Sequence, residues 1–191
     1  DLLDELEIAD NTIVMYSTDN GAETISWPDG GTTPFHGEKG TTWEGGFRVP
    51  AIIRWPGKVP EGAVANGIFD SLDWMPTLVA AAGGPEDLPA RLKEGYEGYT
   101  VHLDGYNFLP FLTGETEETP RREIFYFTDD GDLSALRYND WKVTFLKQNA
   151  EGYKVWTKPF EVLRAPSLTN LRMDPFERAE PEDAMGYQRW W

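Results

Sequence analysis

Two short runs of apolar residues in the first third of the chain have the character of buried strands. They cover residues 13–17 and 49–55 and are bounded by turn-forming residues. Continuous apolar runs of this length are typical of strands that are covered on both faces of a parallel sheet. Residues 1–8 carry leucines at helical spacing and predict the last two turns of a helix that begins upstream. This order of helix and strand predicts an α/β sheet.

Helical spacing returns in residues 69–82. Asp70 or Ser71 can cap the start of this helix, and a Gly-Gly pair follows its end, as helix termini favour. Residues 84–107 contain Gly, Pro and Tyr without a clear period and predict an irregular connection. Residues 107–114 then predict one or two helical turns.

From about residue 121 the pattern changes to short β-type segments separated by turns. These segments are residues 123–128, 134–138, 141–146 and 153–157. Asn139-Asp140 separates two of them and is a two-residue hairpin signal. We therefore expect two domains. Residues 1–120 form the C-terminal part of an α/β domain, and residues 121–191 form a small antiparallel β subdomain with a terminal helix or tail.

The composition narrows the range of partners. The chain has 191 residues, a formal net charge of −16 and no cysteine. The phosphates of nucleic acids and anionic membranes would meet a repulsive field, so we expect neither as a partner. The apolar runs are too short to span a bilayer, and the first residues do not resemble a secretory signal. The sequence leaves the cellular location open. Because the chain as a whole is negatively charged, an anionic substrate must be bound by a local positive site.

A long glycine-rich loop, residues 18–47, joins the two predicted strands. Asp19 and Asn20 open it directly after the first strand, at the end where open α/β sheets bind ligands. Carboxylate and amide oxygens suit Ca²⁺ or Mg²⁺, although Asp-Asn-Gly is also common in ordinary turns. Two ligands do not complete a site for either ion, so the others must come from elsewhere.

The same loop carries Lys39 between glycines. Such a lysine can approach an oxyanion closely as a point charge, and the order of residues differs from that of a phosphate-binding P-loop. The alternative is a solvated lysine in a flexible loop. Glu38 and Glu44 can each pair with Lys39 or Arg48, or face water. His36 by itself is more typical of a residue that packs the loop.

Taken together, these segments resemble the sulfatase family, specifically the arylsulfatase-type members of the alkaline-phosphatase-like superfamily. The matching segments, in the order of the family, are ELEIADNTIVMYSTDNG, PFHGEKGTTWEGGFRVPAIIRWPGKVP, FDSLDWMPTLVAAAG, LDGYNFLPFLTGE and LTNLRMDPFERAE. The most specific part is Lys-Gly-Thr-Thr-Trp-Glu-Gly-Gly followed by Arg-Val-Pro and a strand. The resemblance implies the C-terminal part of an alkaline-phosphatase-like α/β sheet and the hydrolysis of sulfate esters.

The resemblance also implies roles for three residues. Asp19 and Asn20 correspond to two ligands of the metal ion, Ca²⁺ with Mg²⁺ as an alternative. Lys39 corresponds to a catalytic and substrate-binding lysine that contacts the sulfate of an aryl or sugar sulfate ester. It stabilises the charge that develops on the leaving oxygen. No role is implied for His36, where several relatives have another residue.

The nucleophile of the family is absent from this sequence. Formylglycine is made from Cys or Ser in a Cys/Ser-x-Pro-x-Arg motif, and no serine of this chain precedes that Pro and Arg. We therefore expect the C-terminal portion of a sulfatase, inactive alone, whose partner is the missing N-terminal half of the domain. A periplasmic or secreted location is compatible with the intact protein.

Two alternatives stay open from the sequence. One is a non-catalytic module that folds alone or self-associates through an exposed sheet edge and helix face. The other is part of a phosphate or phosphonate monoester hydrolase, since the superfamily handles both anions.

Overall fold

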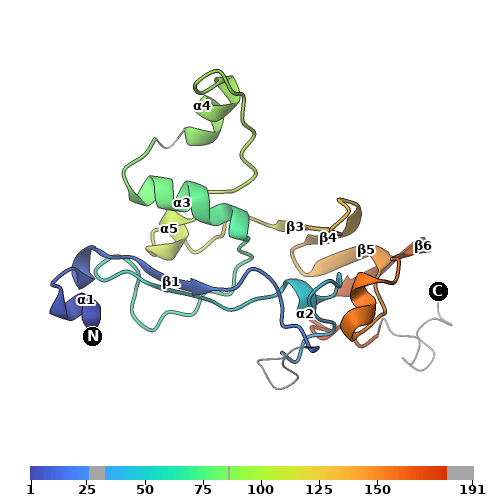
Figure 1. Cartoon of the computed structure of the whole chain (residues 1–191). Coiled ribbons are helices and arrows are strands. Elements are labelled where there is room, and N and C mark those ends of the chain that lie inside the picture. The colour runs from blue at the N-terminus through green and yellow to red at the C-terminus, as the bar shows by residue number, and fades with distance from the viewer. Residues whose placement is uncertain (26–32, 86, 180–191) are drawn as a thin grey trace. The chain divides into compact units, whose positions relative to one another are not determined.

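The computed structural model describes residues 1–25, 33–85 and 87–179 (Figure 1). The chain divides into two compact units. The first, here called the helical unit, comprises Asp1–Tyr16 and Ile52–Arg122. The second, here called the loop–sheet unit, comprises Ser17–Ala51 and Glu123–Trp191. The domain boundary near residue 120 stays a prediction, and the predicted terminal helix or tail lies largely outside the described residues.

The chain begins with α1 (Leu2–Glu5), which is shorter than the predicted helix. The carboxylate of Asp1 caps it by accepting hydrogen bonds from the amides of Leu3 and Asp4 at 3.0 and 3.2 Å. A 3₁₀ turn, η1 (Ala9–Asn11), follows the helix. The first turn is therefore stabilised locally by an acidic side chain at its N-terminus.

The two apolar runs form strands where the sequence predicts them. They are β1 (Val14–Ser17) and β2 (Ala51–Arg54), which pair in a two-stranded sheet. The prediction that both strands are buried is wrong here. The side chains of Tyr16 and Ile52 are each 62% exposed, because no further layer of the described residues covers this sheet.

The predicted helix over residues 69–82 is confirmed as η2 (Ser71–Asp73) followed by α3 (Trp74–Ala81). Asp70 caps it in a reciprocal capping box. Its carboxylate accepts from the Leu72 amide at 3.0 Å, and its own amide donates to Asp73 at 2.8 Å. Gly83 follows the end of the helix with φ of +79°, a backbone conformation that glycine adopts at no steric cost.

Two further helices complete the helical unit. α5 (Leu109–Leu112) confirms the predicted helical turns. α4 (Leu88–Glu94) lies in the segment predicted to be irregular. It begins with a proline in its first turn, a position where the missing amide proton has no cost. An exposed ion pair between Asp87 and Arg91, 2.6 Å apart, spans its first turn.

The helical unit contains a buried ion pair. The guanidinium of Arg121 donates two hydrogen bonds to the carboxylate of Asp73, at 2.7 and 2.8 Å. The same carboxylate accepts from the Tyr106 amide at 2.7 Å, and Arg121 also donates to the Asp104 carbonyl at 2.8 Å. Beside this pair the fully buried Phe108 ring packs against aromatic neighbours. The start of the helix is thereby held to the connection that follows it.

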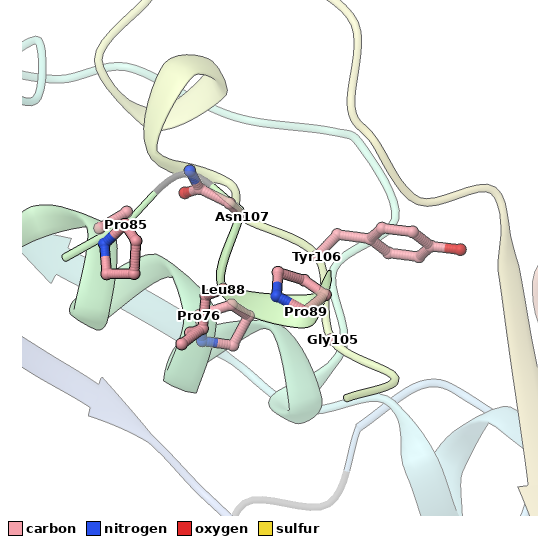
Figure 2. Close-up of a pocket in the computed structure, with 8 residues that line it drawn as sticks. Pro76, Pro85, Leu88, Pro89, Gly105, Tyr106 and Asn107 are labelled. Carbon is pink, nitrogen blue, oxygen red and sulfur yellow. The ribbon is translucent and has the colours of Figure 1, made fainter. Parts of the chain in front are cut away.

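A small pocket lies beside α3 and α4 in the helical unit (Figure 2). Its lining residues are Pro76, Ala80, Pro85, Leu88, Pro89, Gly105, Tyr106 and Asn107. Figure 2 shows the Tyr106 ring extending away from the prolines. None of these lining residues carries a charge, so the pocket does not present the groups that an oxyanion or a metal ion requires.

The loop–sheet unit contains a four-stranded antiparallel sheet in the order β3-β4-β5-β6. The strands are β3 (Glu123–Phe127), β4 (Leu133–Tyr138), β5 (Trp141–Lys147) and β6 (Glu161–Asn170). The predicted Asn139-Asp140 hairpin is confirmed, since Tyr138 pairs with Trp141. Asn139 has a φ of +50°, which asparagine tolerates better than most residues.

Two segments of this unit differ from the prediction. Residues 153–157 do not form a strand but lie mostly in a 3₁₀ helix, η3 (Gly152–Trp156), and the last strand is β6 instead. The glycine-rich loop ends in one helical turn, α2 (Glu44–Phe47). In the described part of the chain, every helix is too short or too polar to cross a membrane.

Candidate oxyanion and metal site

The three residues that the sequence singles out lie in segments that the structure joins. Asp19 and Asn20 follow β1, and Lys39 lies further along the same loop. The amide of Lys39 donates to the carbonyl of Ala22 at 3.0 Å, and the amide of Gly21 donates to the carbonyl of Gly46 at 2.8 Å. The Asp-Asn turn and the lysine segment are thus adjacent within one unit.

Three glycines allow these backbones to touch. A Cβ atom on Gly21 would lie 1.7 Å from the carbonyl oxygen of Gly45, and one on Gly45 would lie 2.5 Å from that of His36. A Cβ atom on Gly46 would lie 2.6 Å from the carbonyl oxygen of Thr41. Any larger residue would push the segments apart, so close packing requires glycine at these three positions.

The side chains of Asp19 and Asn20 present oxygen atoms of the kind that a hard cation binds. Asp19 is exposed, and its carboxylate accepts a hydrogen bond from the Thr18 hydroxyl at 3.3 Å. The amide nitrogen of Asn20 donates to the Gly21 carbonyl at 3.0 Å, which leaves the amide oxygen for another partner. This donor pair fits Ca²⁺ or Mg²⁺. The described residues contain no cluster of three or more His, Cys, Asp or Glu side chains that could hold a metal.

The Lys39 side chain is half-buried, and its ammonium lies 5.8 Å from the centre of the Trp156 ring. Within the described residues no carboxylate lies within ion-pair distance of it, and the neighbouring Glu38 points to other partners. In the part of the chain that the structure describes, the Lys39 ammonium is therefore not neutralised by a carboxylate, and its contact with an anion stays a prediction.

Glu38 anchors the lysine segment on two sides. One carboxylate oxygen accepts from the amide and hydroxyl of Thr24, at 2.9 and 2.7 Å, and the other accepts from the Gly152 amide at 2.6 Å. Burial alone would raise the pKa of this carboxyl. The hydrogen bonds from Gly152 and Thr24 outweigh burial and lower the pKa below its ordinary value of 4.5.

We expect Glu38→Gln to lower the free energy of unfolding of the loop–sheet unit by about 2 kcal/mol at neutral pH, since hydrogen bonds to a charged group are lost. Because the pKa of Glu38 is lower in the folded chain, its contribution is complete above the unfolded value of 4.5. The contribution disappears as the pH falls through the folded value. Urea unfolding of both proteins from pH 7 to pH 3 measures this, and a difference that stays constant with pH would contradict it.

Glu44, six residues further on, lies in a buried cluster of charges. Its carboxylate accepts a hydrogen bond from the Tyr126 hydroxyl at 2.7 Å and pairs with Arg48 at 3.1 Å. The ammonium of Lys142 lies 3.3 Å from the Glu44 carboxylate, and the guanidinium of Arg137 lies 3.7 Å from it. Of the alternatives open from the sequence, the pair with Arg48 is the one observed.

Lys142 is fully buried and joins the cluster to the C-terminal segment. Its ammonium donates to the carboxylate of Glu177 and to the carbonyl of Thr42, both at 2.8 Å. The second carboxylate oxygen of Glu177 accepts from the Glu44 amide at 2.7 Å. The cluster of Glu44, Lys142 and Glu177 therefore holds the glycine-rich loop against the antiparallel sheet.

The two buried carboxyls of this cluster differ in acidity. Burial raises the pKa of Glu44, but the charge of Lys142 and the Tyr126 hydroxyl group outweigh it and lower the pKa. At Glu177 burial dominates, and the pKa is raised. Burial and the adjacent Glu44 also raise the pKa of Tyr126 well above 10.0. Glu44 is thus the stronger acid of the two and keeps its charge.

Sequence reasoning missed Lys142 and Glu177, which hold the glycine-rich loop. Lys142 and Thr144 alternate with apolar residues along one strand, and such a polar face normally points to solvent. Here both residues are buried, and the ammonium of Lys142 meets a carbonyl and a carboxylate of the loop. The alternation of polar and apolar residues was the available signal, and it indicated that Lys142 faces solvent. Lys142 instead contacts Thr42, which lies about a hundred residues away in the chain.

The fold and the paired segments define the class of this protein. The structure is similar to the crystal structure of the PsFucS1 sulfatase from Pseudoalteromonas sp., with a TM-score of 0.77 and 33% identity. That similarity covers 94% of this chain and 34% of the other. The α/β portion and its antiparallel sheet therefore belong to the alkaline-phosphatase-like fold.

The sequence comparisons lead to the family. Residues 1–84 match the sulfatase family model. Human arylsulfatase A is 35% identical over 185 residues, which cover 91% of this chain and 34% of the relative. The N-acetylgalactosamine-6-sulfatase of Canis lupus familiaris is 33% identical over 198 residues, with 93% and 35% covered. The chain belongs to the sulfatase family and matches a C-terminal portion of its relatives, spanning about a third of their length.

Proposed function

We propose that this chain contributes part of the active site of an arylsulfatase-type sulfuric ester hydrolase. The observation that carries the proposal is the hydrogen bond between the Lys39 amide and the Ala22 carbonyl. It holds the segment that carries Lys39 beside the turn that carries Asp19 and Asn20. Membership of the sulfatase family supports the same assignment.

In this proposal the three residues have different tasks. Asp19 and Asn20 hold one side of a Ca²⁺ or Mg²⁺ ion, which supplies positive charge to the sulfate oxygens. The ammonium of Lys39 donates a hydrogen bond to the sulfate and stabilises the negative charge that develops on the leaving oxygen. Glu38 assists indirectly, because its own hydrogen bonds keep it from neutralising Lys39.

The nucleophile lies outside this sequence in the proposal. Since the chain contains no formylglycine motif, we propose that it is inactive alone and that the N-terminal half of a sulfatase domain completes the site. Turnover of an aryl sulfate by the purified 191-residue chain would contradict this part of the proposal.

Lys39→Ala tests the sulfate contact. We expect the affinity of the chain for 4-nitrophenyl sulfate in the presence of Ca²⁺ to fall about tenfold or more, the size of a lost charge-assisted hydrogen bond. Ligand-observed NMR titration measures it. Lys58→Ala, which removes an exposed lysine of the helical unit, should leave the affinity unchanged.

The same titration separates the candidate anions. Equal affinity of the wild-type chain and of Lys39→Ala for the sulfate ester would contradict the proposal. Preferential binding of 4-nitrophenyl phosphate over the sulfate ester would instead favour a phosphate ester hydrolase.

A further inference from the structure

We infer that Trp156 forms a subsite beside Lys39 that binds the ring of a ring-bearing sulfate ester. This inference rests on the proposed function, because it assigns the sulfate itself to Lys39. The ligand chemistry is a ring with an apolar face, either an aryl ring or a pyranose. Trp156 would then act as a residue that determines specificity.

The position of Trp156 relative to the lysine segment is set by several contacts. The 3₁₀ helix that ends at Trp156 begins at Gly152, whose amide donates to Glu38 at 2.6 Å. Val155 is buried and packs on Gly40, where an added Cβ atom would lie 3.2 Å from Val155. Glu38 and Gly40 flank Lys39 on either side, so the helix is held to both neighbours of the lysine.

The far end of this short helix is held as well. The amide group of Gln148, a buried side chain, donates to the carbonyls of Val155 and Lys158 at 3.4 and 2.9 Å. Both ends of the helix are bound to the rest of the unit, so the backbone that carries the Trp156 indole is held in place.

Trp156 nevertheless exposes a large part of its ring. Its side chain is 49% exposed, and Tyr153 in the same helix is 76% exposed. Tryptophan usually covers most of its surface in a folded domain. An indole that is firmly placed and yet half open to solvent has apolar area that a ligand can cover.

The combination of the indole and the ammonium matches the two halves of a sulfate ester. Lys39 lies over the Trp156 ring at 5.8 Å from its centre and can bind the anionic half. The open part of the indole can pack against the organic half, since aromatic faces stack on rings and on apolar surface. A sulfate ester joins these halves through a single oxygen, so one molecule can contact both groups.

The test compares ring-bearing and ring-free sulfates. The 191-residue chain and its Trp156→Ala and Trp156→Phe variants are titrated by ligand-observed NMR with four probes. Two probes carry a ring, 4-nitrophenyl sulfate and methyl glucopyranoside 6-sulfate, and two do not, methyl sulfate and inorganic sulfate. Trp141→Ala is the matched control, because Trp141 is also 49% exposed and lies in β5 of the same unit.

We expect Trp156→Ala to weaken the ring-bearing probes by about three- to tenfold, the usual range for a lost aromatic contact. The two ring-free probes should keep their affinity, Trp156→Phe should recover most of the loss, and Trp141→Ala should have no effect. A larger loss for the aryl ester would identify an aryl subsite. A larger loss for the pyranoside would identify a sugar subsite, and either result supports the inference.

Three results would overturn the inference. They are an unchanged affinity for the ring-bearing probes in Trp156→Ala, an equal loss for inorganic sulfate, and no binding of any ring-bearing probe to the wild-type chain. The proposed function fails separately, if Lys39→Ala leaves the affinity for inorganic sulfate and the esters unchanged while Trp156→Ala still weakens the ring-bearing probes.

Discussion

Replacement of Lys142 by methionine is expected to lower the free energy of unfolding of the loop–sheet unit by about 3–5 kcal/mol, the cost of breaking a buried ion pair from one side. Methionine fills a similar volume, so the effect comes from charge. Glu44 and Glu177 would lose the ammonium that lies 3.3 and 2.8 Å from them, and all three side chains are at most 2% exposed. The carbonyl of Thr42 would lose its donor as well.

Hydrogen exchange measures this effect locally, because the amides of β3 to β6 report on the loop–sheet unit alone. Lys154→Met is the control, since Lys154 is exposed, and its effect should be within about 0.5 kcal/mol. Adding Glu177→Gln to Lys142→Met should restore part of the lost stability, because one buried carboxyl then carries no charge. A loss equal to that of Lys154→Met would contradict the central role of the buried cluster.

Asp73→Ala is expected to lower the free energy of unfolding of the helical unit by a similar amount, about 3–5 kcal/mol. Its carboxylate is completely buried and accepts from the guanidinium of Arg121 and from the amides of Asp70 and Tyr106. Alanine would leave the two amides without their acceptor and remove the carboxylate that faces Arg121 in the interior.

Asp87→Ala is the matched control for Asp73→Ala. It removes the carboxylate of another Asp–Arg pair in the same unit, but there the side chains of Asp87 and Arg91 are 59% and 64% exposed. Exposed pairs contribute only about 0–1 kcal/mol. Hydrogen exchange of the α3 amides compares the two variants. Equal effects would show that burial does not decide the value of these pairs.

Local chemistry was enough to predict several elements. The helix over residues 69–82 has a capping residue at one end and glycines at the other, and the Asn139-Asp140 turn joins strands that are adjacent in the sequence. Both depend on interactions between residues a few positions apart. The segment 153–157 has strand-forming residues, yet it follows Gly152, whose amide is bound by Glu38 far along the chain. That long-range contact favours a 3₁₀ turn over the local preference.

The candidate site divides in the same way. The residue types in the loop and the family resemblance were sufficient to select Asp19, Asn20 and Lys39 as candidates, and their assignment as ligands and as a sulfate contact remains a proposal. The residues that contact the glycine-rich loop could not be predicted from the sequence. Glu44 meets Lys142 across 98 residues of sequence, and its amide meets Glu177 across 133.

The sequence by itself determined the family, the order of most helices and strands, and the residue types that can bind an oxyanion and a metal ion. Only the tertiary structure decided which charges are buried and paired. Glu38 accepts hydrogen bonds from amides and a hydroxyl, and the Lys142 side chain is buried beneath the loop. The physical reason is that the strength of a charge depends on its burial and its neighbours, and those neighbours come from distant parts of the chain.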